Sequence, residues 1–192
     1  MIAREGHVKG TVLVHMRSFV VENQGEGAWQ ALLDALGPED RAILGEIVLV
    51  GGWYPVRAWN NAMNVYLPRH YPIPGKGMTV LAKYIAEKDL GMLFKMLLKV
   101  GSPGFLMGRT PSIWSRYFDS GALASEEIDK GRWKLTLEGP TRETEAPNAW
   151  TCGDGVCAWI GKGLELTGTR ADVVQTACRY RGAQRCEYLA TW

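Results

Sequence analysis

Apolar positions in the first part of the chain recur with the spacing of amphipathic helices. One stripe runs from Val12 to Val20, and Gln24–Gly27 separates it from a second stripe between Trp29 and Leu36. Pro38, followed by two acidic residues, is typical of the first turn of a helix, where the missing N–H is tolerated and the helix dipole favours negative charge. This pattern predicts three consecutive helices.

The same spacing continues to residue 118, interrupted by proline and glycine. A helical stripe from Val56 ends at Pro68, and the proline-rich stretch 68–77 is predicted to be a loop. Ile47–Val50 has the length and composition of a strand or of the end of a buried segment, and 51–55 is typical of a turn. The remaining predicted helices are Met78–Lys88, Leu90–Val100 and Ser112–Phe118, the last capped by Thr110-Pro111.

From residue 122 the hydrophobic period changes to two. Residues 122–128 and 132–138 predict a hairpin, because the second arm alternates Trp133, Leu135 and Leu137 with polar residues. A short helix ending at Gly168 follows, and then a second hairpin whose arms are 171–180 and 185–192. The predicted fold class is α+β, with N-terminal helices packed on a mainly antiparallel sheet of about four strands.

Composition agrees with one ordinary globular domain. Of the 192 residues, 46% are hydrophobic and 22% charged, which is enough for a core. We expect a single domain over 1–192, with a mostly helical part at 1–118 and a hairpin–helix–hairpin part at 119–192. The net charge of +2 argues against a nucleic-acid surface.

The C-terminal motif VCAWIGKGLEL…VVQTACRYRGAQRCEYLATW resembles the closing motif of the 4-vinyl-reductase-like domain family, and GGWYP and EKDLGMLFKMLLKVGSPGFLMGRTPSIWSRYFDSGAL resemble bacterial, myxobacterial-type paralogues of unknown function. The resemblance implies a fold related to TRAPP-type trafficking subunits and to the sensory domains of phenol-responsive activators. Proteins of that fold include sensors, scaffolds and pigment-biosynthesis domains, so function has to come from the site.

The opening segment KGTVLVHMRSFVVENQGEGAWQALL also resembles the first helices of haem-based nitric-oxide sensors. The Tyr-x-Ser-x-Arg signature of those sensors is absent, and only His7, His15 and His70 are histidines available as axial ligands. The C-terminal resemblance therefore carries more weight in the interpretation.

Four cysteines surround the C-terminal motif: Cys152, Cys157, Cys178 and Cys186. Converging thiolates bind zinc tetrahedrally, but this spacing is not that of a standard ribbon or finger. In the phenol-sensing relatives the resemblance implies Cys, Glu, Cys and Cys ligands, and Gln175 stands where the Glu is expected. Two interpretations stay open, a structural zinc site or small core cysteines, and no cofactor is certain.

The sequence shows no nucleophile elbow, zinc-protease, phosphate-loop or dinucleotide motif, which favours a non-enzymatic role. Our first hypothesis is a sensing or regulatory module whose apolar pocket binds a small apolar or aromatic ligand. The candidate ligand-binding residues are Trp114, Tyr117, Trp133 and Trp159. The alternatives are a dimeric scaffold in signalling or motility and, third, a reductase-like or lipid-processing enzyme.

The two edges of the predicted sheet favour a homodimer, with a protein partner as a further possibility. The charged N-terminus is unlike a signal peptide, and no apolar run approaches the length of a membrane span. We therefore expect a cytoplasmic protein.

Overall fold

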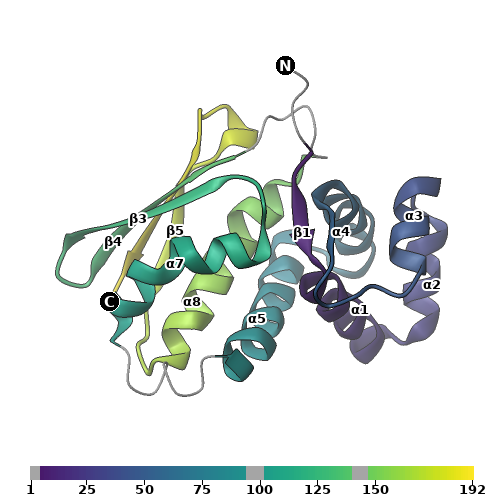
Figure 1. The fold of residues 1–192 in the computed structure, drawn as a ribbon, viewed down its shortest axis with the longest axis horizontal. Coiled ribbons are helices and arrows are strands. Elements are labelled where there is room, and N and C mark those ends of the chain that lie inside the picture. Colours follow the sequence, from purple (N-terminus) through teal and green to yellow (C-terminus); the bar gives the residue numbers. More distant parts are fainter. Residues whose placement is uncertain (1–4, 94–101, 140–146) are drawn as a thin grey trace.

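The computed structural model describes residues 5–93, 102–139 and 147–192. Its elements follow the predicted order of helices, strand pair, helix and strand pair (Figure 1). The first half consists of β1 (His7–Lys9), α1 (Gly10–Gln24), α2 (Glu26–Asp34), α3 (Pro38–Gly45), β2 (Trp53–Pro55), α4 (Val56–His70) and α5 (Pro74–Leu93). The second half consists of α7 (Pro103–Tyr117), β3 (Ala122–Asp129), β4 (Arg132–Glu138), α8 (Val156–Leu166), β5 (Asp172–Ala177) and β6 (Cys186–Thr191).

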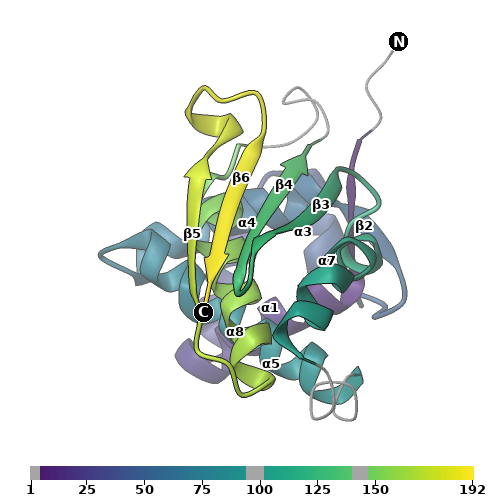
Figure 2. The ribbon, with the colours of Figure 1, turned by 90° about the vertical axis from the view of Figure 1, so that its left-hand side faces the viewer.

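The main sheet is antiparallel throughout, with strand order β3-β4-β6-β5. The predicted α+β class and the four-stranded sheet are thereby confirmed. Helix α7 lies against β3 and helix α8 against β5, while α5 packs on α8, so the helical part meets the sheet through these helices (Figure 2). The two hairpin turns need positive φ, which Gly131 and Gly182 supply at +74° and +101°.

A two-stranded sheet, β1 with β2, connects the helical part to the end of α7. Val8 in β1 is fully buried and also forms a bridge with Phe118, and the Asp119 N–H donates to the His7 carbonyl oxygen at 3.1 Å. The beginning of the described chain is therefore fixed next to the place where α7 turns into the sheet.

Ile47–Val50 is not a strand and not a buried segment, so that prediction is wrong. The side chains of Ile47, Leu49 and Val50 are exposed, Ile47 by 89%. The backbone explains the position: the Val50 carbonyl accepts from Thr11 N at 3.1 Å and the Gly52 carbonyl from Gly10 N at 2.9 Å. These bonds satisfy the otherwise unpaired first N–H groups of α1, and they hold the loop where its side chains face outward.

Proline misled the prediction of three helix boundaries. Helix α4 continues through Pro68 to His70, and α5 begins at Pro74, which shortens the predicted loop. Helix α7 begins at Pro103, capped by Ser102 Oγ accepting from Phe105 N at 3.1 Å, so Pro111 lies inside it rather than at its start. The break predicted at residue 89 is absent, since α5 runs to Leu93; the rest of the helix predicted to end at Val100 lies outside the described residues.

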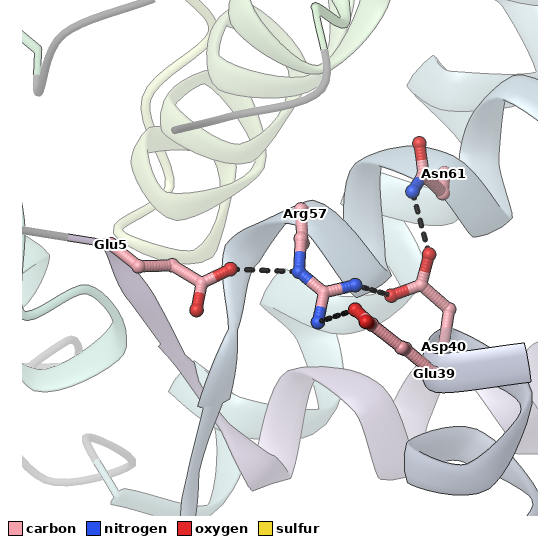
Figure 3. Close-up of polar contacts among 5 residues, drawn as sticks. All are labelled: Glu5, Glu39, Asp40, Arg57 and Asn61. Carbon is pink, nitrogen blue, oxygen red and sulfur yellow. Dashed lines mark hydrogen bonds and ion pairs between the residues drawn. The ribbon is translucent and has the colours of Figure 1, made fainter. Parts of the chain in front are cut away.

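One half-buried arginine joins three parts of the helical half. Arg57 at the start of α4 pairs with Glu5 before β1 and with Glu39 and Asp40 at the start of α3 (Figure 3). Asp40 is only 4% exposed and also accepts from Asn61 Nδ2 at 2.6 Å. Because the carboxylate is buried, its charge depends on Arg57 and Asn61 for compensation.

Candidate ligand cavity

An apolar cavity of about 140 Å³ lies between the helical half and the sheet. Helices α1, α4, α5, α7 and α8 and strands β3 and β4 all contribute to its wall. The helical stripe of α4 turns Val56, Trp59 and Asn60 to the cavity, and one face of α5 supplies Met78, Ala82 and Ile85. The cavity therefore forms only when both halves of the chain have packed together.

Three of the four predicted aromatic ligand-binding residues lie in this wall: Trp114, Tyr117 and Trp159. The Tyr117 and Trp159 rings pack edge to face with centroids 5.8 Å apart, and Trp114 stacks on Phe118 at 4.3 Å. The fourth, Trp133, is not among the lining residues; it packs against Gly104 and Gly108 of α7, where small residues leave room for its ring.

The aromatic wall is held by internal hydrogen bonds. Trp59 Nε1 donates to Thr151 Oγ1 at 3.2 Å, and Trp114 Nε1 donates to the Ser120 carbonyl oxygen at 3.3 Å. Burial raises the pKa of Tyr117, helped by the neighbouring Asp89 carboxylate, so its phenol stays protonated. These rings can therefore offer apolar faces to a ligand without leaving their own donors unpaired.

Asp89 of α5 lies next to Tyr117 and binds two residues of α1. Its Oδ1 accepts from Thr11 Oγ1 at 3.1 Å and lies 2.8 Å from His15 Nε2. The carboxylate is only 6% exposed. This contact could not be predicted because Thr11 and Asp89 are far apart along the chain.

The chain enters α8 through a π-helical turn, Thr151–Gly155, which also lines the cavity. Gly155 faces Met78, whose sulfur would lie 3.1 Å from an added Cβ, so a glycine lets this turn approach α5 closely. Single π turns within α-helices are frequently found at functional sites. The sequence motif around Cys152 marked this region, but not its unusual backbone.

Three of the four candidate metal ligands come together behind the wall. The sulfur atoms of Cys152, Cys178 and Cys186 all lie within 4.8 Å of one another, and the three residues are buried. Cys157 is outside this group, and burial, with Asp154 and Asp172 nearby, raises its pKa to about 12. Among the described residues, the four cysteines are free thiols.

The pKa values of the Cys152 and Cys186 thiols shift in opposite directions. A hydrogen bond from Cys152 lowers the pKa of Cys186 to about 6, supported by the Arg179 backbone N–H at 3.4 Å. The same bond, together with burial, raises the pKa of Cys152. Cys152, which lines the cavity, is therefore the protonated partner.

The sequence analysis did not anticipate the buried polar residues of the wall, among them Asn60 and Thr110. Asn60 and Thr110 are buried polar residues, 4% and 2% exposed, that line the cavity. A signal existed for Asn60, because it follows Trp59 within the apolar stripe of α4, where a buried amide is unusual.

None of the helices in the described part of the chain is long and apolar enough to cross a membrane.

Comparison with solved structures identifies the fold of this chain. No family model and no curated protein sequence matches the chain. Solved structures do match: an H-NOX protein from S. oneidensis in the Fe(II)NO ligation state has a TM-score of 0.72 at 12% identity, covering 95% of this chain and 97% of that one. The Fe(II) unliganded H-NOX protein from K. algicida has a TM-score of 0.71 at 11% identity, covering 95% of each chain. The chain therefore has an H-NOX-like fold.

These matches correct two expectations. They give no support to the 4-vinyl-reductase-like, TRAPP-like or paralogue resemblance, whereas the resemblance of the opening helices to haem-based sensors agrees with them. The expectation of no certain cofactor, with zinc as the open alternative, is also overturned, because the matched structures are haem proteins, including one studied for its haem redox potential and porphyrin distortion. Haem is the cofactor to test against these residues.

The lining residues do not fit haem. None of the three histidines lines the cavity: His7 pairs with Asp119, His15 with Asp89, and the His70 ring lies 4.7 Å from that of Tyr66. The protonated Cys152 and Tyr117 are poor substitutes for the thiolate or phenolate that can ligate haem iron. A volume of about 140 Å³ is also close to that of an apolar cavity that accepts benzene, whereas haem joins four pyrrole rings.

Proposed function

We propose that this chain is a small-molecule-sensing module that binds a small, mainly apolar ligand in the cavity between its helices and its sheet. The observation that carries the proposal is the cavity itself, about 140 Å³ in volume and walled by aromatic and aliphatic side chains. Trp114, Tyr117 and Trp159 are the proposed contacts for the ligand. The shared H-NOX-like fold supports a sensing role, since the matched structures were solved in different ligation states.

The position of the cavity allows a bound ligand to change how the elements around it pack. Its wall combines α1, α4 and α5 with α7, α8 and the sheet, so a ligand contacts elements from 1–118 and from 119–192 together. This shared wall also supports the interpretation of the whole chain as one domain. A ligand that favours one packing of these elements over another would shift the population between them.

Native mass spectrometry of freshly purified protein is the first test. We expect an added mass of a small organic molecule, and a mass equal to haem would contradict the fit described above. As an independent measurement, saturation-transfer NMR with benzene should detect binding to the wild-type protein.

Ala82→Phe makes this test specific to the cavity. Ala82 lines the cavity and is 7% exposed, so a phenyl group there should fill the space and abolish benzene binding. Ala124→Phe, at an exposed position of β3, is the matched control and should bind like the wild type. Equal benzene binding by both variants would overturn the proposed site.

A second candidate, a scaffold that binds another copy of the chain, rests on the exposed loop between α3 and β2. Ile47, Leu49, Val50 and Trp53 are 89%, 66%, 59% and 42% exposed and follow one another closely. Apolar side chains gathered in this way often mark an interface. Light scattering should then give a dimer mass for the wild type and a monomer mass for Ile47→Ser with Leu49→Ser; a wild-type monomer would exclude this role.

A further inference from the structure

Asn60 places one unused amide in the wall of the apolar cavity. It follows Trp59 on α4, lines the cavity and is only 4% exposed. Its backbone carbonyl accepts from Asn148 Nδ2 at 3.3 Å. Within the described residues its side-chain amide forms no hydrogen bond.

Neighbouring polar groups behave differently. Asn148, also in the wall, donates from Nδ2 to Asn60 and Asn64 and accepts from Thr151 N at 2.8 Å. Thr110 Oγ1 donates to the Met107 carbonyl oxygen, and Trp59 Nε1 donates to Thr151. The side-chain donors of Asn148, Thr110 and Trp59 are thus paired within the protein, and the amide of Asn60 is left for whatever enters the cavity.

A buried amide without a hydrogen-bond partner destabilises the folded protein, so a partner in the cavity is expected. Trp133 Nε1 has neither a hydrogen-bond partner nor accessible surface. The unpaired amide of Asn60 differs, because it keeps some accessible surface. The open space that it meets is therefore the cavity that it lines. A water molecule needs two to four polar partners to be held well, and one amide among apolar groups holds it weakly, so a ligand can displace it.

We propose that the ligand of this cavity is an uncharged molecule of about the size of one aromatic ring, carrying a single hydrogen-bonding group that the Asn60 amide binds. This inference rests on the proposed sensing function and adds the chemistry of the ligand to it. The volume of about 140 Å³ sets the size, and the apolar wall sets the chemistry of the rest of the molecule.

The neutral amide also selects against charged ligands. An ion that enters this cavity loses its hydration shell. The single hydrogen bond that the Asn60 amide offers does not offset the free energy lost with that water. The cation in the wall, Arg179, already donates from Nη2 to the Tyr180 hydroxyl at 3.0 Å and lies over the Tyr180 ring at 4.8 Å. We therefore assign ligand recognition to Asn60 rather than to Arg179.

Two probes of nearly equal shape test the inference: benzyl alcohol and its hydrocarbon counterpart ethylbenzene, with benzoate as the charged analogue. Each dissociation constant is measured by titration against wild type, Asn60→Leu and the control Asn23→Leu. Asn23 is an exposed asparagine whose amide donates to the Phe19 carbonyl oxygen, away from the cavity wall. Thermal melting with circular dichroism confirms that each variant is folded.

The quantity that decides is the dissociation constant of ethylbenzene divided by that of benzyl alcohol. Loss of one neutral hydrogen bond should lower this ratio by between about twofold and tenfold in Asn60→Leu, and leave it unchanged in Asn23→Leu. Benzoate should bind more weakly than benzyl alcohol to the wild type. An unchanged ratio in Asn60→Leu would overturn the role of Asn60 and leave the sensing function standing.

A measurement on the wild-type protein covers the case in which Asn60→Leu does not fold. The side-chain amide signal of Asn60 in a ¹H–¹⁵N spectrum should move when benzyl alcohol is added and move much less with ethylbenzene. Equal shifts would overturn the inference. Failure of all three probes to bind would overturn both the inference and the proposed function, whereas tighter binding of benzoate would replace the neutral ligand with an acid.

Discussion

Tyr188, fully buried in the inner strand β6, donates a hydrogen bond of 2.7 Å from its hydroxyl to the carbonyl oxygen of Cys152 in the π-helical turn. This contact joins the sheet to the segment that lines the cavity next to α5. Gln175 Nε2 on β5 donates to the same carbonyl at 3.1 Å. The turn is thus held from behind by two strands.

Tyr188→Phe should lower the free energy of unfolding by about 1 kcal/mol, because one buried hydrogen bond is lost while the ring and its packing remain. Chemical denaturation measures the change. Tyr84→Phe is the control: its hydroxyl donates to Glu22 at 2.9 Å near the surface, and its loss should cost less. Equal effects of the two variants would show that the bond to Cys152 contributes nothing particular.

The thiol pair Cys152 and Cys186 predicts a pH dependence of stability. The pKa of Cys186 is about 6 in the folded protein against an ordinary value of 9, so between these values the unfolded chain binds more protons. The free energy of unfolding contributed by Cys186 should therefore rise from pH 6 to pH 9 and be lost as the pH falls through 6. Urea denaturation under reducing conditions measures it.

Cys186→Ala is the matched variant for this pH series. It should show a smaller rise in the free energy of unfolding between pH 6 and pH 9 than the wild type, whatever the loss of packing costs at a single pH. Parallel curves for the two proteins would mean that Cys186 has no lowered pKa.

Two glycine-to-alanine changes should have opposite effects. A Cβ at Gly10 would collide with the Leu49 carbonyl oxygen, so Gly10→Ala must displace the loop that caps α1 and should destabilise the protein. Gly27 lies in α2 with nothing within 4 Å of an added Cβ, so Gly27→Ala should stabilise by up to about 1 kcal/mol through helix propensity. Thermal melting distinguishes them, and a stabilised Gly10→Ala would refute the close approach.

Arg57→Met should lower the free energy of unfolding by roughly 2 kcal/mol or more, because the buried Asp40 carboxylate keeps only Asn61 as a partner. Arg17→Met is the control, since the Arg17–Glu26 pair is more than half exposed on both sides and such pairs contribute little. Denaturation of both variants in low salt measures the difference; a loss no larger in Arg57→Met would contradict the importance of this cluster.

The sequence predicted the fold class well where local signals decide the structure. The alternation at Trp133, Leu135 and Leu137 located β4, and the glycine-containing turn located the last hairpin. It failed where a distant backbone decides: Ile47–Val50 has the composition of a strand, but α1 uses its carbonyl groups as a cap. Proline signals failed for a related reason, because Pro68 and Pro111 are accommodated inside helices.

The candidate site was only partly accessible to sequence reasoning. The aromatic side chains of Trp114, Tyr117 and Trp159 could be predicted to line a pocket, yet Trp133 is aromatic too and lies outside the wall. The place of Asn60 in the apolar stripe of α4 is a signal that it is buried, but the sequence could not show that its amide lacks a partner, because pairing depends on residues far along the chain. The sequence did not point to haem as the cofactor to test, because the chain shares its fold with the H-NOX haem proteins at only 10–12% identity or so.

Strand order also sets the time at which the cavity wall can be completed. Strand β6 lies between β4 and β5, and its pairing joins Arg132 to Thr191. During synthesis the edge of β4 that faces β6 stays unpaired until residues 186–191 have been made, about fifty residues after β4 itself. Long-range pairing of this kind is slow to form. The helices can fold early, but the wall behind the π-helical turn is assembled last, so a nascent chain lacks the finished ligand site.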